Sequence, residues 1–396
     1  MFLFILFFLM VLILNPYTIF GPFAYFFAIP FLFYSFVNYF KYLDKKILFI
    51  FLVMIFISFV GVLSSYIHGI EQYEHLKVSV SIPLYFLIGC GLYFVSYKNN
   101  IYFNDICFMA LLAILFNSII ILIEVSYPSF RELVESFLVG AGNRDWAEGF
   151  RYRGIASSGG ASLSVLHAMG VVLLLYLIGE KYLSVLKASL ILLPIILSIF
   201  FIGRTGLVFI GLAILIFTLF SKKNIQFFIF LFLFFLSIYF FFDELVAYLT
   251  EIYGEGFYNY SLGFLVEGRE GIENEGTVDT IHGFLKVMPV TFPEVLIGYG
   301  FYGGSDFHNW TDSGYSRMFL SVGYLFGISY YLCFLLLLKR IFLFKKSLFL
   351  LMIPLILLAE AKESLLFSGY SSRFLFIIIG FLIMEKRFYL KEKVNI

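Results

Sequence analysis

Apolar runs of roughly 20 residues, each long enough to cross about 30 Å of hydrocarbon as a helix, recur from one end of this chain to the other. None shows the ten-residue alternation of apolar and polar side chains that is typical of a membrane β-barrel. Of the 396 residues, 62% are hydrophobic and 13% are charged, whereas charged residues make up about a quarter of a soluble domain. The sequence therefore predicts an all-α polytopic membrane protein.

Glycine, proline and charged residues divide these runs into twelve predicted transmembrane helices. The first lacks the basic segment and the small-residue cleavage site of a signal peptide, so we interpret it as a retained helix. The first and the eleventh are short for a full crossing of the bilayer. The twelve lie near residues 1–14, 17–40, 47–68, 78–97, 106–127, 161–179, 182–202, 205–220, 225–242, 315–338, 347–359 and 365–384.

Charged loops assign a side of the membrane to each helix end. With both termini in the cytoplasm, the inner loops hold 14 of the 17 lysines, as the positive-inside rule requires. Positive charge that served topology alone would avoid the outer face in both residue types. Eight of the ten arginines nevertheless lie on the outer side, namely Arg131, Arg144, Arg151, Arg153, Arg204, Arg269, Arg317 and Arg373.

Two predicted outer loops are too long to be simple helix connections, and each contains amphipathic stretches expected to lie along the membrane surface. They divide the chain into five parts. The expected organisation is transmembrane helices 1–5 in residues 1–127, a first large loop in 128–160, helices 6–9 in 161–242, a second large loop in 243–314, and helices 10–12 with a cytoplasmic tail in 315–396.

Arg151 and Arg153 stand two residues apart in the first long loop, before a Gly-Ser-rich turn. Arginine suits phosphate, because its planar guanidinium donates two parallel hydrogen bonds and stays charged at any workable pH. The turn also offers backbone N–H groups at the start of the sixth helix, where an anion is favoured. The pair therefore indicates a phosphate or pyrophosphate ligand. The alternative is a solvated loop in which these arginines pair with Glu148 or Asp145.

Arg204 lies in IGRTGLVFIG, with apolar sequence on both sides. A charge in that setting costs about 2.5–3.5 kcal/mol unless it faces a polar cavity or an interface. Gly203 and Gly206 flank the arginine, as a close turn between two helices requires. Snorkelling of the side chain to the outer interface is the alternative to a ligand-binding role.

The stretch SDFHNWTDSGYSRMF leads into the tenth predicted helix. His308 lies between Asp306 and Asp312, and a base that works near neutral pH can be built from any of the three. Arg317 follows a turn at Ser313-Gly314 and is a further candidate phosphate ligand. Polar residues also collect at the outer ends of the last two helices, with ion pairs between helices as the alternative role, and these are Glu360, Lys362, Glu363, Tyr370 and Arg373.

Patterns of several enzyme classes are missing from the sequence. It contains no H-E-x-x-H, no Walker loop, no G-x-S-x-G elbow and no paired Cys-x-x-Cys. We interpret the remaining histidines, His68, His75, His167 and His282, as structural, and the cysteines Cys90, Cys107 and Cys333 as packing residues without metal-ligand spacing. Hydrolase, ATPase and zinc-protease functions therefore lack support, and neither a metal nor another cofactor is predicted.

Four pieces of the sequence, in this order, resemble the Wzy family of bacterial O-antigen and exopolysaccharide polymerases, to which the O-antigen ligases are related. The third piece, with D-S-G-Y leading into a glycine-containing helix, weighs most. The pieces are RYRGIASSGGASLS (151–164), IGRTGLVFIG (202–211), LIGYGFYGGSDFHNWTDSGYSRMFLSVGYLFG (296–327) and AEAKESLLFSGYSSRFLF (359–376).

The resemblance implies a metal-independent glycosyltransferase of the GT-C-like class in the bacterial inner membrane. Such enzymes join oligosaccharide repeat units carried on undecaprenyl pyrophosphate at the periplasmic face. The growing chain passes to the terminal sugar of an incoming lipid-linked unit, and undecaprenyl pyrophosphate leaves. The implied partners are this donor, this acceptor, membrane lipid and a chain-length regulator, with no nucleic acid.

Roles for individual residues follow from the same resemblance. His308 or Asp312 would accept the proton of the attacking sugar hydroxyl, and the choice between them stays open. The outer basic residues Arg151, Arg153, Arg204, Arg317, Lys362 and Arg373 would bind pyrophosphate. The aromatic residues Trp146, Tyr152, Trp310 and Tyr315 would stack on sugar faces, and the alternative role of Trp and Tyr is to mark the membrane interface.

Two other functions compete with the polymerase. An O-antigen ligase uses the same donor with a lipid A–core acceptor. A lipid-linked oligosaccharide flippase also has about twelve helices, but it should carry its charges along a central path through many spans and needs only short loops. In this sequence the charged residues concentrate on one side of the membrane, and the 243–314 loop is long. Both features disfavour the flippase.

Overall fold

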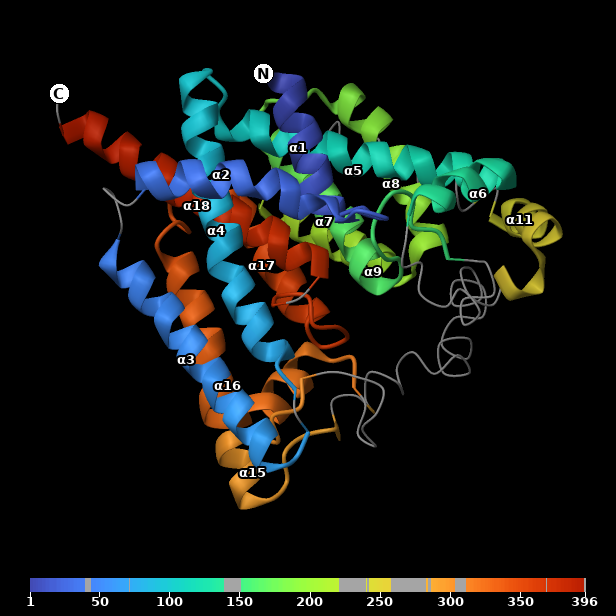
Figure 1. Cartoon of the computed structure of the whole chain (residues 1–396). Coiled ribbons are helices and arrows are strands. Elements are labelled where there is room, and N and C mark those ends of the chain that lie inside the picture. Colours follow the sequence, from blue (N-terminus) through green and yellow to red (C-terminus); the bar gives the residue numbers. More distant parts are fainter. Residues whose placement is uncertain are drawn as a thin grey trace. The chain divides into compact units, whose positions relative to one another are not determined.

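The computed structural model describes residues 1–39, 44–70, 72–138, 151–220, 240, 242–257, 283, 286–302, 311–367 and 369–394. Helices dominate this part of the chain (Figure 1). Its strands are confined to a small antiparallel hairpin of β1 (Tyr17–Thr18) and β2 (Gly21–Pro22).

Fourteen of the helices have the following bounds: α1 Phe2–Leu14, α2 Phe23–Tyr39, α3 Lys45–Ile67, α4 Glu74–Lys98, α5 Phe103–Ser126, α6 Pro128–Phe137, α7 Ala161–Gly179, α8 Val185–Ile202, α9 Thr205–Phe220, α11 Phe242–Phe257, α15 Phe292–Ile297, α16 Gly314–Lys339, α17 Lys346–Ala359 and α18 Gly369–Val394. Eleven of the twelve predicted spans overlap with one of these helices. Most of the remaining span, 225–242, lies outside the described residues.

Six helices in the described part of the chain, α3, α4, α5, α7, α8 and α16, are long and apolar enough to cross a membrane. Four others, α1, α2, α9 and α17, are apolar but shorter. The fold is therefore that of an all-α membrane protein, as predicted. The count of twelve spans stays a prediction.

Two predicted spans have wrong boundaries. The span predicted at 17–40 begins instead with the β1–β2 hairpin, because Pro16, a positive φ at Gly21 and Pro22 interrupt the helix. The span predicted at 365–384 is replaced by α18, which continues to Val394 through a polar segment. Hydropathy marks where a helix leaves an apolar environment, but glutamate and lysine are good helix formers and extend it beyond that point.

Close contacts divide the chain into two compact units. The first comprises Met1–Ala24, Asn104–Asp279 and Leu350–Leu355, and the second comprises Tyr25–Phe103, Thr280–Phe349 and Ile356–Ile396. In the first unit, α7 packs against α8 and α9. In the apolar stretch of α7, 94% of the residues are buried, which is expected of a helix at the centre of a packed unit.

In the second unit, α4 packs along α18, and α3 packs along α4 and α16. Glycines bring α4 and α18 into backbone contact. A Cβ atom on Gly89 would lie 2.0 Å from the carbonyl oxygen of Ile377, and one on Gly380 would lie 2.1 Å from that of Phe86. Small residues at such a crossing let two membrane helices approach closely.

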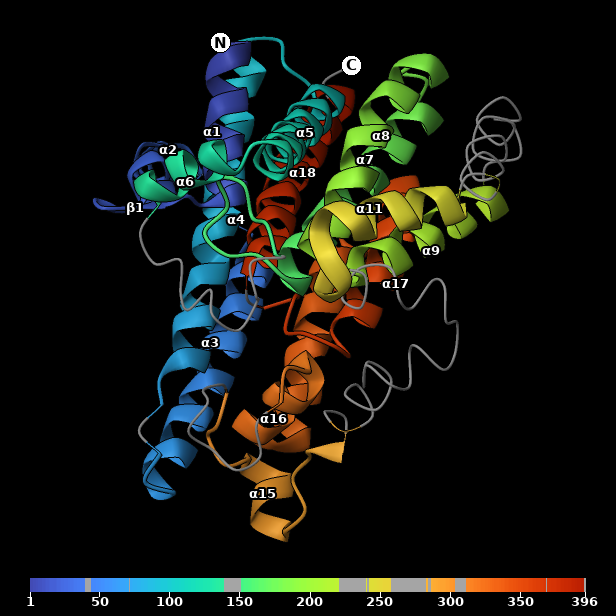
Figure 2. The same ribbon diagram turned by 90° about the vertical axis from the view of Figure 1, so that its right-hand side faces the viewer.

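Helix α16 is broken at Gly323, where φ is 76° and ψ is 174°. Two carbonyl groups before the break accept hydrogen bonds from a segment outside the helix. Leu320 O accepts from Tyr299 N at 2.6 Å, and Ser321 O accepts from Gly300 N at 3.1 Å. A break inside a membrane helix is tolerated where neighbouring segments satisfy the freed backbone groups. The segment after α15 therefore lies against α16, and α15 sits at one end of the α3–α16 pair (Figure 2).

Candidate functional site

Polar side chains of α5 hold the segment that carries Arg151 and Arg153. Asn117 Nδ2 donates to Arg153 O at 3.2 Å, and Asn117 Oδ1 accepts from Ile155 N at 3.0 Å. Glu124 Oε2 accepts from Gly154 N at 3.3 Å. Both side chains are buried. They satisfy backbone groups that have no helix or strand partner, as a buried loop requires.

His167 of α7 completes this support. Its Nε2 accepts from Asn117 Nδ2 at 3.2 Å, and its Nδ1 lies 3.1 Å from both Ser118 Oγ and Ser198 Oγ. The imidazole thereby links α5, α7 and α8 in the first unit. This arrangement agrees with the structural role predicted for His167.

The turn between α8 and α9 carries Arg204 and packs on the start of α7. Tyr152 N donates to Phe201 O at 2.9 Å, and Gly206 N donates to Ser164 Oγ at 3.2 Å. A Cβ atom on Gly206 would lie 2.6 Å from the carbonyl oxygen of Ser164, so glycine is required for this approach. The predicted close turn is confirmed, and it brings the motifs 151–164 and 202–211 together.

The arginines near this junction have different surroundings. Arg153 is 9% exposed, and its Nη1 donates to Ser157 O at 3.0 Å. The guanidinium of Arg131 lies 4.3 Å from the centre of the Tyr152 ring and donates to Arg151 O at 3.1 Å. Arg131 thus supports the loop, and Tyr152, predicted to stack on a sugar, already packs against a cation. Arg151 Nη1 lies 3.6 Å from the position that a Cβ atom of Gly160 would take, just before α7.

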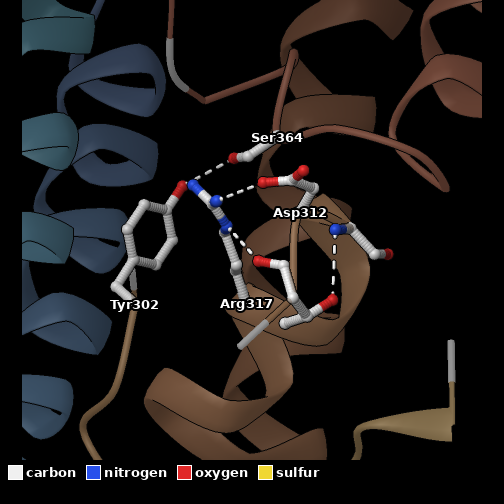
Figure 3. Close-up of polar contacts among 6 residues, drawn as sticks. Tyr302, Asp312, Arg317 and Ser364 are labelled. Carbon is white, nitrogen blue, oxygen red and sulfur yellow. Dashed lines mark hydrogen bonds and ion pairs between the residues drawn. The ribbon is translucent and has the colours of Figure 1, made fainter. Parts of the chain in front are cut away.

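Arg317, in the first turn of α16, is the centre of a second polar group. Its Nη2 forms an ion pair with Asp312 Oδ1 at 2.9 Å, and its Nε donates to Thr311 O at 2.8 Å (Figure 3). Two contacts at different nitrogens fix the plane of the guanidinium. The Arg317 and Asp312 side chains are 21% and 36% exposed, so a ligand can reach them.

Local sequence explains how Asp312 and Arg317 come to lie side by side. Ser313 is the N-cap of α16, and its Oγ accepts from Ser316 N at 3.4 Å, which satisfies one of the unpaired N–H groups at a helix start. The N–H of Ser313 in turn donates to Thr311 Oγ1 at 3.2 Å. The turn predicted at Ser313-Gly314 is therefore a helix cap, and Gly314 is the first residue of the helix.

Tyr302 and Ser364 close this group on its other side. The Tyr302 and Ser364 hydroxyls are 3.0 Å apart, and the Tyr302 hydroxyl points toward the Arg317 guanidinium (Figure 3). Burial raises the pKa of Tyr302 well above its ordinary value, although the nearby Arg317 acts to lower it. Tyr302 therefore stays protonated and can donate or accept a hydrogen bond at this position.

Asp312 lies within the electrostatic reach of two basic groups. Burial raises the pKa of Asp312, while the positive charges of Arg317 and Lys362 act to lower it. The net shift moves this carboxylate toward the range in which it can accept a proton. Three of the predicted site residues, Asp312, Arg317 and Lys362, thus belong to one group in the second unit.

Two further predicted residues of the second unit have other contacts. Tyr315 Oη donates to Leu357 O at 2.7 Å, and its ring lies 5.3 Å from that of Tyr331. The Arg373 guanidinium lies 5.6 Å from the centre of the Tyr85 ring. Predicted residues outside the described part of the chain are His308, Asp306, Trp310, Trp146, Glu148, Asp145 and His282.

Glu360, for which an ion pair between helices was the alternative role, is fully buried after α17 and joins the last two motifs. Its Oε2 accepts from Leu365 N at 2.8 Å and from Leu366 N at 2.6 Å. Its Oε1 accepts from the Tyr331 hydroxyl at 3.1 Å, and its backbone oxygen accepts from Gly314 N at 2.8 Å. Glu360 therefore ties the turn after α17 to the start of α16, and motif 359–376 to motif 296–327.

Replacing Glu360 by glutamine is expected to remove one contribution to the pH dependence of stability. Burial raises the Glu360 pKa from 4.5 to about 7, against the hydrogen bonds that favour the charged form. The folded chain therefore binds this proton more tightly than the unfolded chain, and stability present below pH 4.5 is lost as the pH rises through 7. The loss is on the order of 3 kcal/mol.

Melting temperatures of the purified full-length protein between pH 4 and 8 measure this effect. The melting temperature of Glu360→Gln minus that of the wild type should increase as the pH rises from 4 to 8, because the variant lacks the carboxyl group that loses its proton, while its amide oxygen can still accept from the two backbone N–H groups. Parallel pH curves for the two proteins would show that Glu360 does not titrate in this range.

Sequence reasoning missed Tyr302 and Ser364 and assigned Glu360 no specific partner. A usable signal existed for Glu360, because a carboxylate that directly follows an apolar helix needs an internal partner. For Tyr302 and Ser364 no such signal exists, since each is one of many aromatic or hydroxyl side chains near a helix end.

Comparison with known proteins finds no matching family model, no matching curated protein and no matching solved structure. The class defined by the fold is an all-α membrane protein with two groups of polar and basic residues, one in each unit. Among the described residues, no group of three or more histidine, cysteine, aspartate or glutamate side chains is arranged to hold a metal ion.

Proposed function

We propose that this chain is an O-antigen polymerase, a metal-independent glycosyltransferase of lipopolysaccharide biosynthesis. It joins oligosaccharide repeat units carried on undecaprenyl pyrophosphate at the periplasmic face of the bacterial inner membrane. In this proposal the fold is GT-C-like with twelve spans, and both termini are cytoplasmic.

The observation that carries the proposal is the pairing of the four motifs that resemble this family. Motif 151–164 contacts motif 202–211, and motif 296–327 contacts motif 359–376. Each pair contributes arginine to a polar region at helix ends. Motifs that are far apart in sequence and meet in space are expected where they serve a common site.

The chemistry assigned to Arg317 is stabilisation of the leaving group. Attack of a sugar hydroxyl on the anomeric carbon breaks the bond to pyrophosphate, and negative charge develops on the departing oxygen. A fixed donor aimed at that charge lowers the barrier, because it needs no reorganisation during the reaction. The contacts of Arg317 with Asp312 and Thr311 supply such fixation, and Lys362 adds positive charge nearby.

The proton of the attacking hydroxyl needs an acceptor. Asp312 has a raised pKa and a partly exposed carboxylate, and His308 is the other candidate. Donor and acceptor each carry a pyrophosphate, so the reaction calls for two basic groups. We assign Arg151, Arg153 and Arg204 to one pyrophosphate and Arg317 with Lys362 to another, with Arg373 as a further candidate.

Deletion of the coding sequence, followed by gel electrophoresis of the lipopolysaccharide, tests the function. Loss of the ladder with retention of a core carrying one repeat unit is the result expected for a polymerase. Loss of all O-antigen from the core would identify a ligase instead. An unchanged ladder would count against both enzymes. Restoration of the ladder by the wild-type chain from a plasmid serves as the control.

A further inference from the structure

A basic cavity lies in the second unit, away from the four motifs. Its volume is about 380 Å³, within the range of about 300–1,000 Å³ in which small ligands bind. Its walls come from the start of α3, the turn after α16 and the second half of α18. The proposed reaction uses none of these segments, so the cavity requires another explanation.

Basic side chains outnumber carboxylates in the walls of this cavity. Asp44 already has partners, because its Oδ2 pairs with Arg340 Nη1 and its Oδ1 accepts from Lys46 N at 2.9 Å. The lining thus holds four basic side chains and one carboxylate, and the positive charges attract an anion that enters the cavity. The basic residues of the lining are Lys45, Arg340, Lys386 and Arg387.

The shape of the cavity is held by contacts among its own residues. Lys386 Nζ donates to the carbonyl oxygen of Arg340, which ties α18 to the turn after α16. The Arg340–Asp44 ion pair ties the same turn to the start of α3. Basic groups from three segments are thereby brought to one place before any ligand binds, which lowers the cost of binding.

Apolar surface adjoins the basic groups. Ile47, Ile341 and Ile383 complete the lining and are at most 8% exposed. Two apolar residues close in sequence to the lining are exposed: Leu343, two residues after Ile341, is 81% exposed, and Leu48, the residue after Ile47, is 41% exposed. Helices α3 and α16 are both long and apolar enough to cross a membrane, and the cavity lies at the start of α3 and just beyond the end of α16.

We propose that this cavity binds the phosphate headgroup of an anionic phospholipid. The lysine and arginine side chains hold the phosphate oxygens through charge-assisted hydrogen bonds. Leu343 and Leu48 contact the acyl chains of the same lipid. A soluble phosphate compound would use the basic groups but not this exposed apolar edge. In the predicted topology the cavity faces the cytoplasmic leaflet, whose surface is anionic.

Lipid-dependent melting of the purified full-length protein in detergent tests the proposal. Phosphatidylglycerol should raise the melting temperature by several degrees, because a ligand that binds only the folded state stabilises it. Phosphatidylcholine should leave the melting temperature unchanged. Lys45→Gln combined with Arg387→Gln should remove most of the phosphatidylglycerol shift. The matched control, Lys187→Gln combined with Lys339→Gln, removes two exposed lysines that do not line the cavity and should keep the shift.

Each other outcome overturns the proposal. No shift with phosphatidylglycerol, or the same shift in the Lys45/Arg387 variant, would show that the cavity holds no anionic lipid. A full shift with inorganic phosphate alone would identify a soluble ligand. If the variant does not fold, native mass spectrometry of the wild type decides: bound phosphatidylglycerol should survive higher collision energy than phosphatidylcholine, and equal survival contradicts the proposal.

Discussion

Replacing Arg317 by lysine is expected to reduce chain elongation by about 100-fold or more while the protein still accumulates in the membrane. Lysine keeps the positive charge, but it cannot donate to Asp312 and Thr311 through separate nitrogens and still present a fixed edge to a phosphate. The length distribution of O-antigen on a gel, at matched protein level, measures the effect.

Two comparison variants sharpen this experiment. Arg204→Lys, in the turn between α8 and α9, should also retain insertion and lose most elongation if the first unit binds a pyrophosphate. Lys187→Gln removes one exposed lysine at the start of α8 and should give the wild-type ladder. Polymer of wild-type length from Arg317→Lys would remove this arginine from the proposed chemistry, whatever the result for Arg204.

Replacing Gly380 by alanine is expected to destabilise the second unit by about 3 kcal/mol. The added methyl group would lie 2.1 Å from the carbonyl oxygen of Phe86. That oxygen belongs to the backbone of α4, so α4 and α18 must move apart along their contact. The melting temperature of the full-length protein in detergent should fall by several degrees, and the yield of monodisperse protein should fall with it.

Gly211→Ala is the matched control for this change. Gly211 also lies inside a helix, α9, but a Cβ atom there would meet nothing within 4 Å. Alanine is a better helix former than glycine by up to about 1 kcal/mol, so Gly211→Ala should melt at or slightly above the wild-type temperature. Equal melting of Gly380→Ala and wild type would contradict the close contact of α4 with α18.

Helix positions were largely predictable because their causes are local. The predicted spans 161–179 and 205–220 coincide with α7 and α9, and 182–202 ends with α8. Glycine, proline or charged residues at these ends stop a helix regardless of what packs around it. The close turn at Arg204 was predictable for the same reason, since its flanking glycines are adjacent in sequence.

The break in α16 was not predictable in this way. The sequence predicts a continuous helix over 315–338, and Gly323 alone does not interrupt it. The break is stabilised by Tyr299 and Gly300, whose N–H groups donate hydrogen bonds to the carbonyl oxygens of Leu320 and Ser321. These donors come from a segment more than 15 residues earlier in the chain, so only the folded arrangement shows that they are used.

In the candidate site, too, some features were predictable from the sequence and others only from the tertiary structure. Arg317 and Asp312 were identified as candidates from their residue types and position before a helix. Their ion pair depends on the cap formed by Ser313. The partners of Glu360, by contrast, include Tyr331 in another helix and backbone groups of the following turn, and no spacing rule connects these.

By itself, the sequence determined that this protein is built from membrane helices, where most of those helices begin and end, and which polar residues lie at their ends. These properties follow from hydropathy and from backbone preferences of neighbouring residues, which act over a few turns of helix. Tertiary structure alone decided which motifs meet, where α16 breaks, and which groups satisfy Glu360. Those outcomes depend on hydrogen bonds and close packing between residues far apart in the chain, and such contacts leave no periodic pattern in the sequence.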